Sequence, residues 1–283
     1  LVLCDVDDKT LNISANSIKN NLTKNTRAVV VTHINGVSAD MNKIINIIKK
    51  YDSNIVIIED VARCCGASYD KKKVGCLGDI SVFSFQSKKN ISTLGEGGMI
   101  LTNNYEYYEK MKKRREFGGR KMDAWGSNYK LSKVQSSVGI SQLKKIDKYN
   151  KKRRKVALQR NNMLKKYSKY FSLPVFDEIY YHIYTYYTII LNDMFTRNSR
   201  NKIMKILEEK YQIKTTVANE PTFMIHKYVD EHIDTKYKNI SRELGGRIIN
   251  LPIHFNMSKK DNQYICNSFV KSLYEVLGEL NEK

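Results

Sequence analysis

The chain has 283 residues, of which 41% are apolar and 28% are charged, as in a soluble globular protein of one large or two ordinary domains. Its five cysteines form no Cys-x-x-Cys or Cys-x-x-His grouping, which argues against a zinc site and against a disulfide framework. No apolar run is long enough to span a bilayer, and the first residues are not those of a signal peptide. We therefore expect a cytoplasmic protein without a metal site.

The formal charge of +20 raises the question of an anionic partner. The densest basic run, residues 151–155, lies in a helix-like stretch, and no zinc-finger, RNA-binding or recognition-helix pattern accompanies it. Nucleic-acid binding is therefore the less favoured alternative. Lysines on solvated faces, or an anionic small substrate such as a nucleotide diphosphate, explain the charge equally well.

The first half of the chain alternates strand-like and helix-like segments. Short apolar runs predict strands at residues 1–6, 28–34, 54–60, 80–85 and 98–102. Residues 39–51 have the apolar periodicity of a helix. Strands that alternate with helices predict an α/β fold with a mainly parallel sheet, whose ligands bind beyond the carboxyl ends of the strands.

The second half begins with a long helical stretch, predicted from Ser132, a candidate N-cap, to Tyr167. Its later segments predict a small α+β unit, with strands in residues 182–191 and 248–256 and helices in 200–211 and 262–280. We place the domain boundary near residue 150, which gives a large domain of residues 1–150. A connecting helix and a small C-terminal domain take residues 151–283.

Candidate functional residues follow the predicted strands. Asp60 ends one apolar run, and Lys88 and Lys89 come after the next, ahead of a Gly-Glu-Gly-Gly turn at 95–98. Each has an ordinary explanation by itself, as a helix cap or a surface lysine. Together with the small and polar residues between them, they supply the amine, the carboxylate, the hydroxyl donors and the close backbone approach that a pyridoxal phosphate (PLP) site requires.

Segments spread over nearly the whole chain resemble the DegT/StrS family of PLP-dependent sugar aminotransferases. The resemblance is carried by residues 5–13 (DVDDKTLNI), 32–41 (THINGVSADM), 58–103 (IEDVARCC to GGMILTN), 126–147 (GSNYKLSK to KKID) and 251–254 (LPIH). It implies the aspartate aminotransferase fold, with a three-layer αβα large domain and a small C-terminal α+β domain. It also implies PLP as the cofactor.

The resemblance also implies a role for particular residues. The lysine that binds the cofactor covalently follows the Phe-Ser-Phe run by four residues, which selects Lys89. The partner of the pyridine nitrogen is Asp60, and the phosphate ligands include Ser84 and an asparagine donated by the other subunit, Asn128. The position that contacts the ring hydroxyl is Arg63. Because Asn128 reaches a second chain, the resemblance implies a homodimer.

Other residues are given no role or depart from the family pattern. We expect Lys88 to be solvated, and we assign no role to His33. Arg63 stands where the family usually has Gln or His, and Lys130 and Lys133 replace an oppositely charged pair in the contact segment. Family members also have a segment ahead of the position of Leu1, which supplies a phosphate loop and a ring that stacks on the pyridine. The 283 residues contain neither motif, so we expect them to bind PLP weakly.

The expected function is transamination of a keto-sugar linked to a nucleotide diphosphate, with glutamate or glutamine as the amino donor. Such a reaction would serve the biosynthesis of amino sugars or surface polysaccharides. Two alternatives remain open at this point. One is a catalytically impaired protein of the same fold that binds a sugar nucleotide, and the other is a basic nucleic-acid-binding protein.

Overall fold

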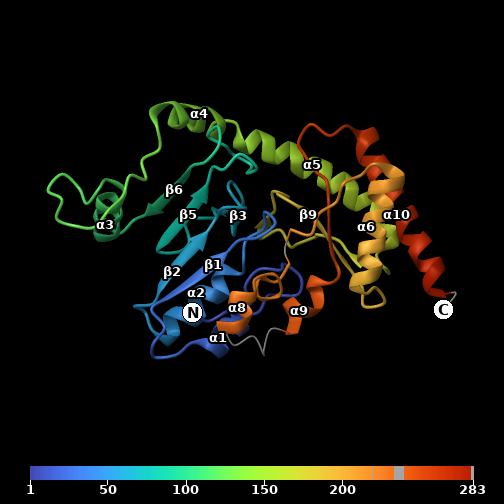
Figure 1. Ribbon diagram of the computed structural model, residues 1–283, viewed down its shortest axis with the longest axis horizontal. Coiled ribbons are helices and arrows are strands. Elements are labelled where there is room, and N and C mark those ends of the chain that lie inside the picture. Colours follow the sequence, from blue (N-terminus) through green and yellow to red (C-terminus); the bar gives the residue numbers. More distant parts are fainter. Residues whose placement is uncertain (219, 233–238, 282–283) are drawn as a thin grey trace.

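A computed structural model describes residues 1–218, 220–232 and 239–281. Its main element is the central sheet, formed by β1 (Ala28–Thr32), β2 (Val56–Asp60), β5 (Ile80–Ser84) and β6 (Gly98–Thr102) (Figure 1). β1, β2 and β5 are parallel, and β6 pairs with β5 in the antiparallel direction. The predicted α/β fold with a mainly parallel sheet is thus confirmed.

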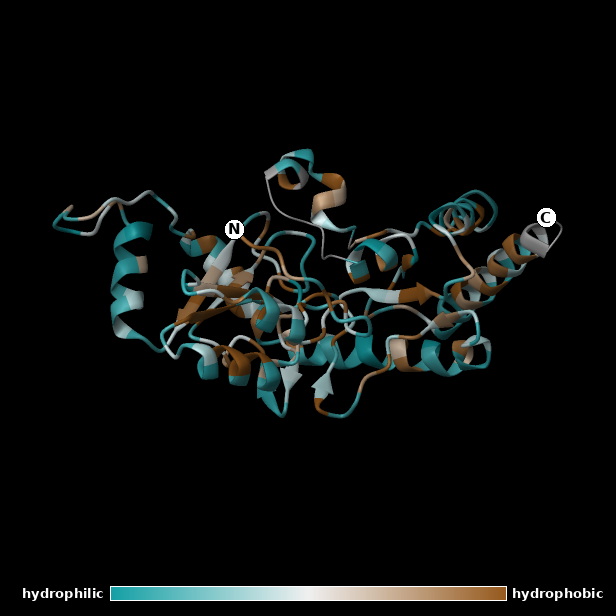
Figure 2. Cartoon of the chain, turned by 90° about the horizontal axis from the view of Figure 1, so that it is seen from below, coloured by the Kyte–Doolittle hydropathy of each residue, from teal (hydrophilic) through white to brown (hydrophobic). Residues whose placement is uncertain are grey.

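The two faces of the central sheet have different surroundings. On one face, Val31 and Ile57 are fully buried against α2 (Met41–Tyr51), and α1 (Ala15–Asn21) contributes Ile18 to the same cluster. The other face includes apolar side chains that remain solvent-exposed, such as Val30 (55%) and Ile100 (50%). Figure 2 shows the apolar strands of this sheet in brown. The carboxyl ends of β2 and β5 therefore open toward an uncovered side of the sheet.

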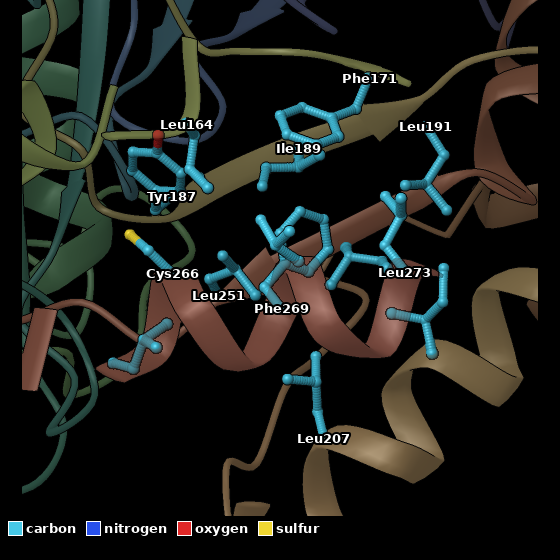
Figure 3. Close-up of a cluster of buried hydrophobic side chains, with 14 of the residues drawn as sticks. Leu164, Phe171, Tyr187, Ile189, Leu191, Leu207, Leu251, Cys266, Phe269 and Leu273 are labelled. Atoms are coloured by element: carbon cyan, nitrogen blue, oxygen red, sulfur yellow. The ribbon is translucent and has the colours of Figure 1, made fainter. Parts of the chain in front are cut away.

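A second, antiparallel sheet organises the C-terminal part of the chain. It consists of β7 (Phe171–Ser172), β9 (Tyr187–Leu191) and β10 (Ile248–Leu251), and it packs on α6 (Arg197–Tyr211) and α10 (Lys259–Asn281). Figure 3 shows the largest buried cluster, in which the Phe171 and Phe269 rings meet edge to face at 5.3 Å. Tyr187, Ile189 and Leu191 alternate along β9, share one face of the strand and all belong to this cluster.

A third sheet joins the two halves of the chain. Its strands are β3 (Ser68–Tyr69), β4 (Lys72–Lys73) and β8 (Tyr180–Tyr181), with β3 in the middle. The remaining helical elements are α3 (Tyr105–Arg115), α4 (Lys133–Leu143), α5 (Ile146–Leu164), η1 (Lys165–Tyr167), α7 (Thr222–Ile225), α8 (Lys227–His232) and α9 (Asn239–Gly245). No helix in the described part of the chain is both long and apolar enough to cross a membrane.

Two predictions about local structure are wrong. The segment of residues 1–6 forms no strand beyond a single bridge between Val6 and Ile13. Its one aspartate, Asp5, instead accepts hydrogen bonds from the backbone N–H groups of Ile240 and Ser241 at the start of α9. The predicted helix from Ser132 to Tyr167 is divided at residues 144–145 into α4 and α5, and it ends in the 3₁₀ turn η1.

Other details of these helices agree with the sequence. Ser132 caps α4 in a capping box with Gln135. α5 crosses the proposed boundary near residue 150 and binds both halves of the chain. Its Asn150 donates to the carbonyl of Cys65 at 3.2 Å, and the Arg160 guanidinium lies 4.6 Å from the ring of Tyr187. The division at residue 150 remains a prediction.

Candidate active site

The carboxyl end of β2 places Asp60 on the uncovered face of the central sheet. Asp60 pairs in register with Thr32 of β1 and Val82 of β5, so these side chains share one face. The Asp60 side chain is partly buried, and its Oδ1 accepts the N–H of Ala62 at 3.0 Å. The Thr32 hydroxyl donates to Oδ2 at 3.5 Å. One carboxylate oxygen is thus left with a long hydrogen bond and can accept a further donor.

The neighbouring carboxylate, Glu59, points to the opposite face and is fully buried. Its Oε2 lies 3.0 Å from Nε2 of the equally buried His33. Nδ1 of His33 accepts the N–H of Ala39 at 3.1 Å, so Nε2 carries the proton and donates to Glu59. His33 is therefore a structural residue, in agreement with our assigning it no role.

Ser84 ends β5 on the same face as Asp60, two residues beyond Val82. The chain then continues as an extended hairpin loop to β6. Backbone hydrogen bonds from Phe85 to Gly97 and from Ser87 to Gly95, both 2.7 Å, hold the base of this loop. Gly97 is required here, since a Cβ would lie 2.3 Å from Oγ1 of Thr93.

Lys89 and Lys88 differ in their surroundings within this loop. Lys88 is exposed, whereas Lys89 is partly buried and its N–H bonds the carbonyl of Gln86 at 2.9 Å. This partial burial, followed by the positive charge of Arg63, lowers the pKa of the Lys89 amine below its usual value. The negative charges of Asp60 and Glu96 oppose the shift. The charges of both Asp60 and Arg63 thus act on the Lys89 amine.

Arg63 follows β2 and contacts a residue that sequence analysis did not single out. Its Nη1 donates a hydrogen bond to the hydroxyl of Tyr186, and its Cζ lies 5.0 Å from the centre of the same ring. The only signal in the sequence is that Tyr184, Tyr186 and Tyr187 follow closely on one another within the predicted strand 182–191. Tyr186 lies just before β9, beside the site.

Asn128 is the one predicted site residue that does not join the others. It is exposed on the loop after α3, where its backbone forms an isolated antiparallel β-bridge with Glu116. Its Oδ1 accepts the N–H of Lys130 at 3.4 Å. In the described part of the chain it forms no hydrogen bond to the four residues of the site, Asp60, Arg63, Ser84 and Lys89. An exposed position is compatible with a contact to another subunit.

The donor set fits the chemistry of PLP. A lowered pKa favours the unprotonated form of the Lys89 amine, which is the form that reacts with an aldehyde. A carboxylate on the same side of the sheet suits a protonated pyridine nitrogen, and the Ser84 hydroxyl and the Arg63 guanidinium suit the anionic oxygens. Lys89, Asp60, Ser84 and Arg63 are the residues that would hold the cofactor.

Comparisons with known proteins agree with this chemistry. Residues 1–270 match the model of the DegT/DnrJ/EryC1/StrS aminotransferase family. GDP-perosamine synthase of Caulobacter vibrioides is 30% identical over 268 residues, which cover 92% of this chain and 70% of that protein. UDP-4-amino-4,6-dideoxy-N-acetyl-beta-L-altrosamine transaminase of Campylobacter jejuni is 30% identical over 275 residues, covering 94% and 71%. Helicobacter pylori PseC, an aminotransferase involved in the biosynthesis of pseudoaminic acid, superposes with a TM-score of 0.86 at 27% identity, covering 97% and 74%.

Proposed function

The chain belongs to the DegT/DnrJ/EryC1/StrS aminotransferase family, and we propose that it uses PLP to transfer an amino group from glutamate or glutamine to a keto-sugar linked to a nucleotide diphosphate. The family and the α/β fold predicted from the sequence are confirmed. The observation that carries the proposal is the partly buried Lys89 amine, whose surroundings include both Asp60 and Arg63. The named relatives act on sugars carried by GDP or UDP, which supports a nucleotide-linked substrate.

Each residue of the site has a distinct role in the proposed reaction. Bound PLP supplies an electrophilic aldehyde and a ring that withdraws electrons from the substrate. Lys89 would hold the cofactor through Nζ. Once released, the same amine would take the proton from the nitrogen-bearing carbon of the amino donor in the first half-reaction and deliver a proton to the corresponding carbon of the sugar in the second. The lowered pKa of Lys89 favours the neutral amine that both tasks require.

The remaining side chains hold and polarise the cofactor. Asp60 binds the pyridine N–H, and a charge-assisted hydrogen bond of this kind contributes about 1.5–3 kcal/mol. Ser84 donates its hydroxyl to the phosphate, and Arg63 donates to the oxygen of the ring. Arginine is longer than the Gln or His expected at this position, and the contact with Tyr186 keeps its guanidinium at the edge of the site.

We further propose that the active unit is a homodimer and that Asn128 reaches the phosphate in the partner's site. Support comes from the loop that carries Asn128, because several of its large apolar side chains are exposed to solvent. They are Phe117 (55%), Met122 (79%), Trp125 (80%) and Tyr129 (75%). Such a cluster is typical of a protein interface.

The proposal is tested by locating the lysine that binds the cofactor. The protein is incubated with PLP, reduced with borohydride and digested, and the modified peptide is sequenced by mass spectrometry. We expect the pyridoxyl group on Lys89, with the same yield in Lys88→Ala and none in Lys89→Ala. Modification of Lys88, or of neither lysine in a protein that still binds a sugar nucleotide, would overturn the assignment and favour a binding protein without aminotransferase activity.

A further inference from the structure

We propose that Thr185 and Tyr186 form a positioning unit that fixes where the Arg63 guanidinium lies relative to the loop that carries Lys89. The inference rests on the proposed function of the site and adds to it two residues from the C-terminal half of the chain. Neither residue is expected to touch the substrate. Their effect passes through Arg63 to Lys89.

The segment that carries both residues is attached firmly to the central sheet. The N–H of Tyr186 bonds the carbonyl of Asn35 at 3.2 Å, and the N–H of Ile183 bonds the carbonyl of Gly36 at 2.9 Å. Gly36 has a φ of +94°, and a Cβ there would lie 2.7 Å from the backbone nitrogen of Thr185. The turn after β1 therefore fixes the position of the segment.

Thr185 connects the two parts of the site. Its hydroxyl donates to the carbonyl of Arg63 at 2.7 Å and accepts from Nδ2 of Asn90 at 2.8 Å. Asn90 is the residue after Lys89. A single hydroxyl thus joins the lysine loop to the turn that carries Arg63, using both its donor and its acceptor capacity.

Tyr186 holds the charged end of Arg63. The phenol oxygen accepts a hydrogen bond from Nη1, and the ring lies 5.0 Å from Cζ. No carboxylate forms an ion pair with Arg63 anywhere in the described structure. Because the partner is a neutral ring, it brings no negative charge that would offset the effect of the guanidinium on the Lys89 amine.

The direction of this effect follows from the charges around Lys89. A nearby cation disfavours the protonated amine, so Arg63 adds to the effect of burial and lowers the pKa of Lys89. The other charged groups that act on the amine, Asp60 and Glu96, have the opposite sign and raise it. If Tyr186 no longer held Arg63, the guanidinium would move toward solvent and the pKa of Lys89 would rise.

The test measures the Lys89 amine directly in the cofactor-free protein. Acylation by acetic anhydride is followed as a function of pH, and tandem mass spectrometry separates the labelling of Lys89 from that of the exposed Lys88, which is the internal standard. The variants are Tyr186→Leu and Tyr186→Phe. Tyr181→Leu is the matched control, because the Tyr181 ring lies 5.0 Å from Cζ of a different arginine, Arg154.

We expect Tyr186→Leu to slow the acylation of Lys89 about threefold at neutral pH, which corresponds to a pKa rise of about half a unit. Tyr186→Phe keeps the ring and should change the rate in the same direction by less, so it remains informative if the leucine variant does not fold. Tyr181→Leu should leave the rate unchanged. In an Arg63→Gln background, Tyr186→Leu should have no further effect, because the charge it positions is absent.

Two results would overturn the proposal. One is a Lys89 rate in both Tyr186 variants that equals the rate in Tyr181→Leu. The other is an effect of Tyr186→Leu that persists undiminished without the Arg63 charge. The measurement needs no PLP, so it is independent of the borohydride experiment. A failure of the proposed function and a failure of the positioning unit can therefore be told apart.

Discussion

Glu59 and Asp60 are neighbours in β2, and their carboxylates lie on opposite faces of the central sheet. Oε1 of Glu59 accepts the N–H groups of Leu77 at 2.7 Å and Gly78 at 2.6 Å, and Oε2 accepts that of Gly75 at 2.9 Å together with His33. Asp60 has no such set of donors and lies at the open side. One carboxylate thus serves the fold, and the other remains available for chemistry.

The first prediction is that Glu59→Gln destabilises the protein. The amide would direct its NH₂ group at donors that now bind a carboxylate oxygen, and a buried N–H left without a partner costs roughly 1–3 kcal/mol. We expect the free energy of unfolding in urea to fall by about 3 kcal/mol. Asp60→Asn is the matched control and should change it by less than about 0.5 kcal/mol. Equal stability of the two variants would contradict the division of roles.

The second prediction concerns acid. Burial by itself would raise the pKa of Glu59, but hydrogen bonds from His33, Gly78 and Gly75 outweigh it and lower the pKa below the ordinary value of 4.5. The folded-state pKa lies below the unfolded one, so this stabilisation is present above about pH 4.5 and is lost as the pH falls through the folded pKa. The stability difference between wild type and Glu59→Gln should therefore shrink from pH 6 to pH 3. Urea titrations at several pH values measure it, and a constant difference would refute the argument.

The third prediction is that Asp60→Asn weakens PLP binding. Loss of a charge-assisted hydrogen bond worth about 1.5–3 kcal/mol reduces the affinity roughly ten- to hundredfold, which an absorbance titration measures. Glu96→Gln is the matched control, because it also removes a negative charge that acts on Lys89. We expect the control to change the affinity by less than about threefold, since Glu96 acts on Lys89 only by long-range electrostatic interaction. Similar losses in both variants would argue against a direct contact with Asp60.

The sequence predicted those parts of the fold and site that depend on local pattern. The apolar runs of β1, β2, β5 and β6 appear as expected, because short β-branched and aromatic segments suit a pleated sheet that is buried on one face. The choice of Lys89 over Lys88 came from the resemblance to the family, and the structure shows that Lys89 is the less exposed of the two. Positions just after parallel strands converge at one edge of the sheet whatever the loops do.

The features that the sequence did not reveal depend on contacts between distant segments. Tyr186 lies more than a hundred residues after Arg63 in the sequence, and its segment is held beside Arg63 by backbone hydrogen bonds to Asn35 and Gly36. The segment of residues 1–6 has strand-like composition, but it forms no ladder, and its Asp5 carboxylate accepts the N–H groups of the distant Ile240 and Ser241. The break between α4 and α5 at residues 144–145 has no glycine or proline to mark it.

The fourth prediction uses the only tryptophan of the chain, Trp125, which is 80% exposed in the isolated chain. If its loop forms the proposed subunit interface, dimerisation transfers the indole from water to an apolar contact. We expect a shift of the emission maximum to shorter wavelength that follows the dimer fraction measured by sedimentation. A Trp125→Ser chain should dimerise more weakly, while Tyr228→Ser, which removes an aromatic residue that is 72% exposed elsewhere, should not. An emission maximum that stays that of a fully exposed indole in a verified dimer would place the interface elsewhere.

The last prediction tests whether two chains share one site. Lys89→Ala and Asn128→Ala chains should each have little activity, but a mixed dimer pairs the intact Lys89 of one chain with the intact Asn128 of the other. Random exchange makes half the dimers mixed, each with one working site, so about a quarter of the wild-type activity should return. Mixing Lys89→Ala with Lys88→Ala shows whether the exchange procedure itself changes the activity. Every site formed by the Lys88→Ala chain keeps its own Lys89 and receives an intact Asn128, so this activity should be the same before and after exchange. If exchange is confirmed by mass and the Lys89→Ala with Asn128→Ala mixture recovers nothing, Asn128 serves the site of its own chain. A site complete within one chain would give the same failure, because neither parent contains both residues.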